Sequence, residues 1–228
     1  MKRMIPFRPW HACALALAGA AAAPGAAHAA ETLPVCPVKH GQTVTYDVIR
    51  GGSVIGSQKL HFTGTGDELA VDVEIGASIE MLSISVYKYH HRGREEWRHG
   101  ELVSLEAETD DDGTPRHVSV HRDPKTGTWL GIAGPPPPAG PLVPASLWNA
   151  KMVSQTHLLD RETGEVVKLT VSHAADEMLH LGGRDIPAER FDMSGQVKGS
   201  VWYDRAGCWL RALFNTRVDG SQIEVVLK

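Results

Sequence analysis

Short apolar runs that alternate with polar residues fill most of this chain and leave little room for helices. Residues 69–75 show the pattern clearly, because Leu69, Val71, Val73 and Ile75 alternate with small or charged residues. A period of two places every second side chain on one face, which is typical of a strand with one buried side. The sequence therefore predicts an all-β fold of antiparallel strands, since similar runs separated by turn residues recur at 44–48, 54–63, 82–90, 102–109, 116–122, 129–132, 166–173, 177–181, 189–193, 197–203, 209–216 and 222–227.

The expected number of strands restricts the shape of the sheet. Roughly eleven to thirteen strands are more than an open, twisted sheet carries without curling. We therefore expect a large antiparallel curled sheet, as a barrel or half-barrel, because rolling the sheet removes unpaired edges. A two-sheet sandwich is the main alternative.

One stretch near the middle of the chain breaks the strand pattern. Residues 134–144 are rich in proline, which has no amide proton to donate to a strand ladder, so they predict a connection. Pro144 then opens a predicted helix over residues 145–159, with Leu147 and Trp148 near one face. The expected fold class is all-β with one short helical insertion, placed to plug or cap the concave side of the sheet.

The N-terminus has the pattern of a secretory signal peptide. Two basic residues precede an alanine-rich apolar stretch, residues 12–23, and small residues surround a cleavage position after Ala29. The stretch is too short for a membrane span, so none is expected in the mature protein. We expect a signal peptide over 1–29 and a single periplasmic β domain over 30–228. A division into two small domains at the proline-rich connection is the alternative.

Charge limits the class of partner, and the cysteine content predicts a disulfide. Removing the signal peptide takes away three of the 23 basic residues and none of the 27 acidic ones, so the net charge moves from −4 to about −7. This balance argues against nucleic acid as a partner. Cys36 and Cys208 remain, and an oxidising compartment favours a disulfide between them, with two buried free thiols as the alternative.

The densest cluster of polar and aromatic residues spans 87–97. On a strand, Tyr87, Tyr89 and His91 share one face, which makes them candidate ligand-binding residues beside arginines that would hold an anionic head group. The alternative is a hairpin whose charged residues pair across strands while Trp97 anchors in the core.

Large aromatic residues supply the other candidates. Trp97, Trp148 and Trp202 either fill the core or line an apolar pocket. If the sheet curls around the predicted helix, Trp148 and some tryptophans of the sheet should meet in the concavity, where a ligand would sit.

No catalytic residue, metal site or cofactor is predicted. His90 and His91 point to opposite faces of a strand, and His117 and His121 would lie about 13 Å apart, too far to share a metal. Ser146 fits better as a residue of the first helical turn, or its cap, than as a nucleophile. The sequence also carries no GxSxG, HExxH, CxxC or phosphate-loop motif. We therefore do not expect an enzyme, and a hydrolase is the less favoured alternative.

Several short motifs resemble those of a known family. They are YDVIRGG at 46–52 with IG at 55–56, EW at 96–97, LVSL at 102–105, LWN at 147–149 and VWYD at 201–204. The chain resembles an uncharacterised family of exported bacterial proteins, described only as a domain of unknown function, which implies no activity and no site residues. An antiparallel sheet wrapped on a helix is also similar in architecture to the carriers LolA and LolB, which hold lipoprotein acyl chains.

Export, strand number and tryptophan content together favour a binding function. We expect a non-catalytic module that shelters an apolar small molecule, a lipid or another amphipathic ligand inside the curled sheet. The alternative is a structural or assembly factor that docks another envelope protein.

Overall fold

The protein is described by a computed structural model over residues 35–65, 67–81, 84–137, 140–216 and 220–228. The predicted signal peptide and its cleavage position after Ala29 lie outside these residues. Within this part of the chain, thirteen strands form one antiparallel sheet. They are β1 Thr43–Arg50, β2 Ser53–Thr65, β3 Glu68–Met81, β4 Ile84–Arg98, β5 Glu101–Asp111, β6 Thr114–Arg122, β7 Trp129–Leu130, β8 His157–Leu159, β9 Val166–Leu181, β10 Arg184–Gly195, β11 Gly199–Tyr203, β12 Trp209–Asn215 and β13 Gln222–Leu227.

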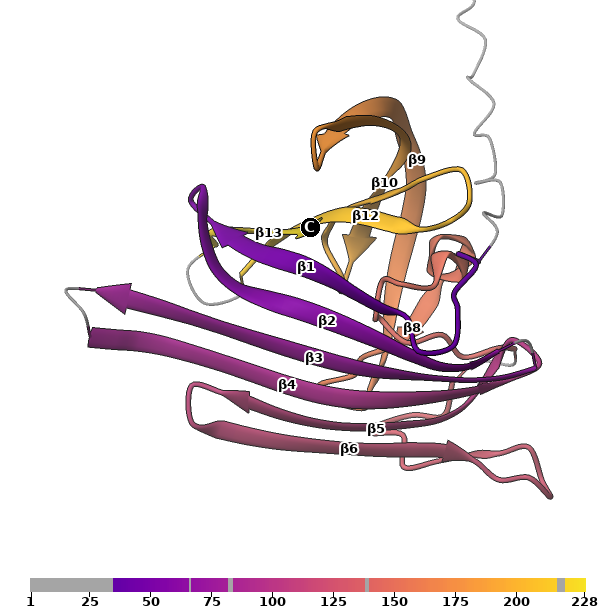
Figure 1. Ribbon diagram of the computed structural model, residues 1–228. Coiled ribbons are helices and arrows are strands. Elements are labelled where there is room, and N and C mark those ends of the chain that lie inside the picture. The colour runs from indigo at the N-terminus through magenta and orange to yellow at the C-terminus, as the bar shows by residue number, and fades with distance from the viewer. Residues whose placement is uncertain (1–34, 66, 82–83, 138–139, 217–219) are drawn as a thin grey trace, which may run out of the picture.

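The strands follow one another across the sheet in the order β7-β6-β5-β4-β3-β2-β1-β13-β12-β11-β10-β9-β8. β1 lies in the middle and pairs with β2 on one side and with β13, the last strand of the chain, on the other. Figure 1 shows β2–β6 as one broad curved layer, with β9, β10 and β12 rising across one side of it. The prediction of a large, curled antiparallel sheet is confirmed, and the two-sheet sandwich is wrong.

The segment between β7 and β8, the two ends of the strand order, closes the curled sheet. Ala133, just after β7, forms an isolated parallel bridge with Glu165, and its amide donates to the Gly164 carbonyl at 2.9 Å. Pro144 forms a second bridge with Leu159 of β8. These contacts bring the two edges of the sheet together and make the fold barrel-like without a continuous strand ladder between the edges.

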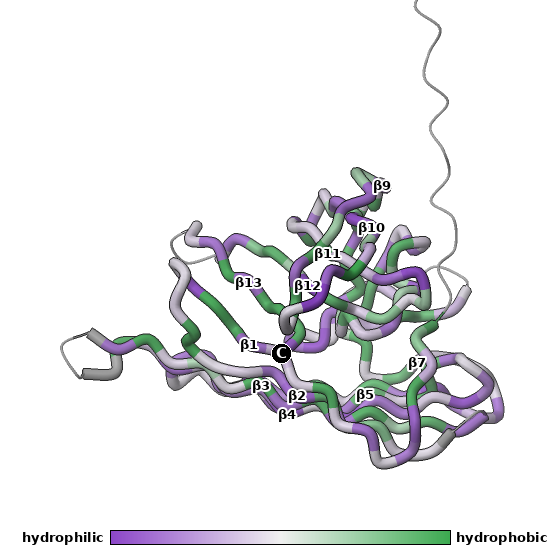
Figure 2. The backbone as a smooth tube through the Cα atoms, turned by 45° about the horizontal axis from the view of Figure 1, so that its top comes forward, coloured by the Kyte–Doolittle hydropathy of each residue, from purple (hydrophilic) through white to green (hydrophobic). Residues whose placement is uncertain are grey.

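The concave face is apolar because residues along each strand alternate between its two sides. Figure 2 shows hydrophobic and hydrophilic positions alternating along these strands. One inward row runs straight across β2–β6, and its members apart from the glycine are at most 4% exposed: Leu60, Val73, Gly93, Ala107 and Val118. Burying a branched side chain of this kind stabilises the fold by about 1.5–3 kcal/mol. Such rows form the floor of the core.

The predicted helix over 145–159 is wrong. Only a 3₁₀ turn, η1 Ala150–Ser154, forms there, and the chain is extended again by Gln155. Leu147 has a positive φ of 67°, which is uncommon outside glycine and ends any regular helix at that point. Its carbonyl accepts a hydrogen bond from the Tyr203 hydroxyl at 2.7 Å, so a tertiary contact replaces a helical one.

Side-chain hydrogen bonds also compete with a helix in this segment. The Asn149 side chain accepts from the Lys151 amide, and the Ser154 hydroxyl donates to the Lys151 carbonyl. Ser146, predicted to cap the helix or lie in its first turn, is instead fully buried outside any helix, and its carbonyl accepts a hydrogen bond from the Trp148 amide at 2.9 Å. The architectural likeness to LolA and LolB depended on this helix, so the fold does not support it.

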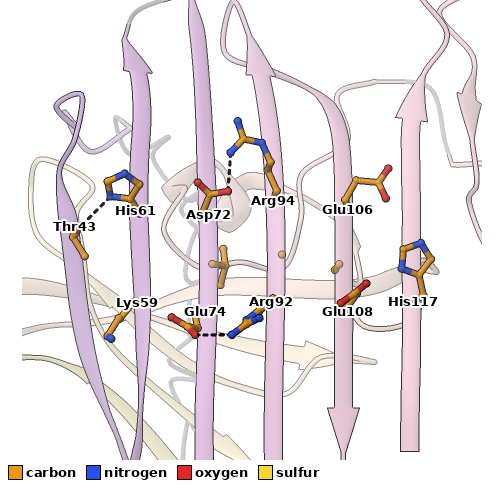
Figure 3. Close-up of a pocket in the computed structure, with 13 residues that line it drawn as sticks. Thr43, Lys59, His61, Asp72, Glu74, Arg92, Arg94, Glu106, Glu108 and His117 are labelled. Carbon is orange, nitrogen blue, oxygen red and sulfur yellow. Dashed lines mark hydrogen bonds and ion pairs between the residues drawn. The ribbon is translucent and has the colours of Figure 1, made fainter.

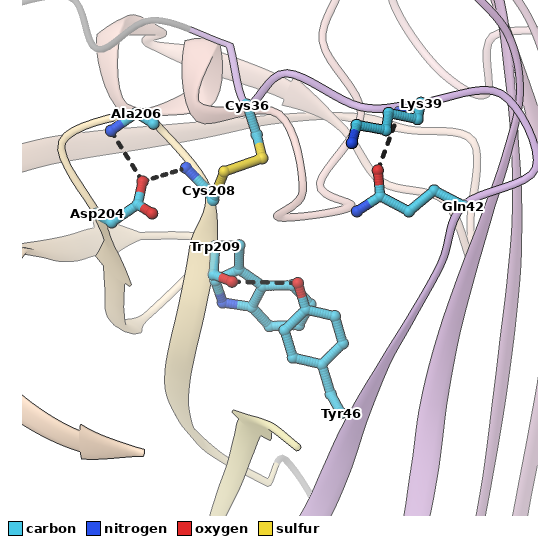
Figure 4. The surroundings of a disulfide bond; sticks show 8 residues. All are labelled: Cys36, Lys39, Gln42, Tyr46, Asp204, Ala206, Cys208 and Trp209. Atoms are coloured by element: carbon cyan, nitrogen blue, oxygen red, sulfur yellow. Dashed lines mark hydrogen bonds between the residues drawn. A yellow bond between two sulfur atoms is a disulfide. The ribbon is translucent and has the colours of Figure 1, made fainter. Parts of the chain in front are cut away.

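The predicted disulfide between Cys36 and Cys208 is confirmed. Figure 4 shows it joining the segment before β1 to the start of β12, across a sequence separation of 172 residues. Next to it, the Asp204 carboxylate accepts from the Cys208 amide at 2.8 Å and shapes the turn that leads into β12. Trp209 stacks on Tyr46 with ring centroids 4.0 Å apart, so the same place joins β12 to β1 through the core.

Candidate functional site on the concave face of β4

The buried side of β4 carries most of the predicted ligand-binding residues. Residues 87–97 lie within this one strand, not in a hairpin, so Tyr87, Tyr89, His91 and Trp97 alternate onto a single face. Trp148 reaches the same face from the connecting segment, with its ring edge-on to that of Trp97 and the centroids 5.5 Å apart. Trp97 anchors in the core, as the alternative reading of this stretch predicted.

The arginines of the cluster face away from this site. Arg92 and Arg94 lie on the outer face of β4, where they pair with Glu74 and Asp72 of β3. The expectation that they hold a head group beside the tyrosines and His91 is therefore wrong, because adjacent strand residues point to opposite faces.

Trp202 lies apart from the other predicted residues. It is buried in a second, smaller apolar cluster with Leu179, Ala188 and Leu210, on the far side of the sheet from its neighbour Tyr203. Its indole N–H donates to the Glu177 carboxylate at 2.8 Å. The structure does not bring Trp202 to the concave face of β4.

A buried carboxyl group, Glu95, lies at the centre of the site. Its Oε2 accepts hydrogen bonds from the indole N–H groups of Trp97 at 3.0 Å and Trp148 at 2.9 Å. Burial raises the pKa of Glu95, and the two indoles, the nearby Ser146 hydroxyl and the Arg161 charge oppose this only in part. Glu95 therefore favours the neutral form and fastens the connecting segment to β4.

His91 is a neutral buried imidazole. Its side chain is 1% exposed, and its Nδ1 shares a hydrogen bond of 2.8 Å with the Thr109 hydroxyl. Burial, then the charges of Arg161 and His90, lower its pKa from 6.5 to about 3. Its Nε2 lies over Gly93, where an added Cβ would come within 3.2 Å of this nitrogen. With this pKa the ring is neutral near pH 7 and carries a single N–H.

A row of polar contacts flanks His91 toward the start of β4. The Tyr89 hydroxyl donates to Glu162 at 2.6 Å, and the Tyr87 hydroxyl donates to Asp111 at 2.8 Å. Arg116 binds the same two carboxylates, at 3.2 Å to Asp111 and 3.5 Å to Glu162. These contacts form the second attachment of the connecting segment to the sheet.

Several buried polar atoms of this region have no hydrogen-bond partner among the described residues. They are Gln58 Nε2, His91 Nε2 and Arg161 Nη1. Each such atom costs about 1–3 kcal/mol while it stays unpaired. Groups of this kind in a native fold mark the place of a water, an ion or a functional partner. The site can therefore offer donors and acceptors to a polar group.

The hollow that the structure shows lies on the opposite, outer face of the same strands. Figure 3 shows two rows of charged and polar side chains that project around it. It has a volume of about 800 Å³ and is lined by Thr43, Lys59, His61, Asp72, Val73, Glu74, Arg92, Gly93, Arg94, Glu106, Ala107, Glu108 and His117. Opposite charges neutralise one another in part, since Arg94 lies 2.8 Å from Asp72 and Arg92 lies 3.6 Å from Glu74.

Sequence reasoning missed Glu95, Arg161 and Gln58. Glu95 continues the inward alternation of Tyr87, Tyr89 and His91, so the strand period already placed it inside. Arg161 lies in a turn, and Gln58 lies on β2, two strands away from β4. No local sequence signal points to either residue.

Comparison with known proteins places the chain in a family. The model of DUF6134, a domain of unknown function, matches residues 46–228. The chain belongs to the DUF6134 family. This agrees with the resemblance found in its short motifs. No curated protein matches this DUF6134 chain.

Two solved structures are similar to this DUF6134 chain. A β-barrel-like protein of the DUF1849 domain of unknown function, from Brucella abortus, has a TM-score of 0.60 at 10% identity and covers 86% of this chain and 97% of its own. An exported protein with a YmcC-like fold, from Bacteroides fragilis, has a TM-score of 0.32 at 9% identity with the same coverage. The first likeness supports the barrel-like fold of the DUF6134 chain and nothing about its function.

Proposed function

We propose that the protein is a non-catalytic binding module of the bacterial periplasm that holds an amphipathic ligand with an anionic head group. The signal-peptide pattern with cleavage after Ala29 supports export, and the Cys36–Cys208 disulfide is typical of an oxidising compartment. No helix among the described residues is long and apolar enough to cross a membrane. The ligand meets the concave face of β4, where residues 142–165 now pack.

The observation that carries the proposal is the group of buried, unpaired polar atoms beside an apolar core. Arg161 takes part in none of the ion pairs of the described residues, yet its charge acts on both Glu95 and His91. An anionic head group would pair with this guanidinium and with the unpaired donor of Gln58. The apolar part of the ligand would then replace core contacts of Trp97 and Trp148.

Ligand entry requires the connecting segment to separate from the sheet. Within the described part of the chain, residues 142–156 make no backbone hydrogen bond to β1–β6. Side chains hold the segment there instead, by Trp148 to Glu95 and by Lys151 to the Gly100 carbonyl. Separation from β1–β6 therefore breaks side-chain contacts and leaves the ladders of these six strands intact, while the bridge of Pro144 to Leu159 keeps the segment joined to β8.

Native mass spectrometry tests the proposal. Mature protein purified from the periplasm without detergent, and then mixed with palmitate or a lysophospholipid, should carry one ligand. Arg161→Gln should weaken this binding roughly tenfold or more, because a charge-assisted hydrogen bond is lost. Arg184→Gln is the matched control, since Arg184 is exposed at the start of β10. Protein that stays empty with both ligands, or equal loss in the control, contradicts the proposal.

The outer-face hollow favours a second candidate, an assembly factor that docks another envelope protein. Its alternating charges are exposed and suit a polar protein surface better than a lipid. A photo-crosslinker at Glu108, in the hollow, should then trap one recurrent partner in cells. A photo-crosslinker at Thr126, in the exposed turn after β6, is the control. Equal capture of the partner from both positions argues against docking at the hollow.

A further inference from the structure

We propose that His173, Asp176 and Glu189 form a binding site for a divalent transition metal, with zinc as the best fit. The three side chains come from the β9–β10 hairpin, and their ligand atoms all lie within 4.8 Å of one another. The site shares no residue with the proposed ligand site on β4 and stands independently of it.

A β-bulge creates the arrangement. Arg190 pairs with Ala175 and Phe191 pairs with His173, so one extra residue, Ala174, is inserted into β9. In a regular strand, residues three apart point to opposite faces. The bulge turns Asp176 back onto the face that His173 occupies, and bulges commonly re-aim side chains in this way.

The charges of the site call for a cation. Asp176 and Glu189 lie directly opposite each other on neighbouring strands, and like charges in that position destabilise a sheet. Neither forms an ion pair with a lysine or arginine of the described residues, because the nearby Arg190 projects to the other face and binds Glu177 and Asp192. Only His173 approaches, at 2.9 Å from Asp176.

The ligand set selects the class of metal. His173 Nε2 and Asp176 Oδ1 are already separated by 2.9 Å, close to the ~3 Å between neighbouring ligands around a metal at ~2.1 Å. An imidazole beside two carboxylates suits zinc and other first-row transition metals, whereas calcium and magnesium take oxygen ligands. The His173 ring also rests edge-on against Phe191, which fixes its orientation.

Zinc titration of the mature protein by calorimetry tests this site. We expect one zinc per chain, and no displacement by an excess of magnesium or calcium. His173→Ala and Glu189→Gln should each weaken binding at least about tenfold, since even an outer-shell partner is worth that much. Glu189→Gln keeps the side-chain shape, so its zinc affinity tests the site even if His173→Ala unfolds.

The chain offers a matched control. His180 and Asp185 form a similar pair on the same hairpin, 2.8 Å apart, but are not part of a three-ligand group. His180→Ala should therefore leave zinc affinity unchanged. Absence of zinc binding by the parent protein, or equal loss on mutating His180 and His173, overturns the proposal.

Discussion

Replacing His91 by asparagine is expected to reduce the loss of stability that acid causes. In the folded protein the pKa of His91 is lowered to about 3, first by burial, whereas in the unfolded chain the imidazole titrates near 6.5. Below pH 6.5 the unfolded state therefore binds a proton that the folded state does not. The free energy of unfolding falls as the pH decreases from about 6.5 toward 3.

The shift in pKa sets the size of the effect. Between pH 8 and pH 5, a group with a pKa of about 6.5 when unfolded and about 3 when folded lowers the free energy of unfolding by about 2 kcal/mol. Asparagine does not titrate, and its side chain can still bond to the Thr109 hydroxyl. Any loss of ring packing acts equally at both pH values and cancels in the difference.

Urea unfolding at pH 8 and pH 5 measures this difference. The pH-dependent loss should shrink by about 2 kcal/mol in His91→Asn relative to the parent protein. His90→Asn is the matched control, because His90 is the preceding residue of β4 and its side chain lies half-exposed on the outer face. An equal loss in His91→Asn and the parent, or an equal reduction in His90→Asn, refutes the account of a buried neutral imidazole.

Three further changes test other parts of the fold. Replacing Cys36 and Cys208 together by serine should lower the free energy of unfolding by up to about 5 kcal/mol in urea titrations, because the disulfide closes a loop of 172 residues; an unchanged midpoint argues against the bond. Glu95→Gln should be at least as stable as the parent protein at pH 7, because the pKa of Glu95 is raised by burial, so the stability that the carboxyl group adds is greatest below about pH 4.5 and is lost as the pH rises. Glu95→Ala should lower the free energy of unfolding by about 2–6 kcal/mol, because it leaves two indole donors unpaired. Equal thermal melting temperatures of the two variants contradict this. Tyr203→Phe should cost about 1–3 kcal/mol by leaving the buried Leu147 carbonyl without its donor, and a neutral result shows that the contact does not hold the segment.

The strand pattern and the disulfide were predictable because they depend on local periodicity and on compartment. The alternation at Leu69, Val71, Val73 and Ile75 repeats on β3 with these side chains turned inward. Opposite faces for His90 and His91 followed from the same period, and the structure confirms them, with His91 buried and His90 exposed.

The connecting segment was not predictable from its sequence because contacts from distant strands determine its conformation. Ser146, Leu147 and Trp148 suit a helix by local propensity, but the Tyr203 hydroxyl and the Glu95 carboxyl bind a non-helical conformation. Tertiary contacts of this strength outweigh helix propensities of a few tenths of a kcal/mol per residue. The grouping of His173 with Asp176, on which the proposed zinc site depends, was not predictable either, because the extra residue Ala174 in β9 brings the two side chains to one face.

Indole N–H resonances report most directly on whether a ligand occupies the concave face of β4. Mature protein with ¹⁵N-labelled tryptophan should be titrated with palmitate and with a lysophospholipid. Binding at the proposed site predicts saturable shifts of Trp97 and Trp148, whose indoles bond to Glu95, and little change at Trp202, which lies in the separate cluster. An unchanged spectrum with both ligands, or shifts confined to Trp202, would contradict the proposed binding function.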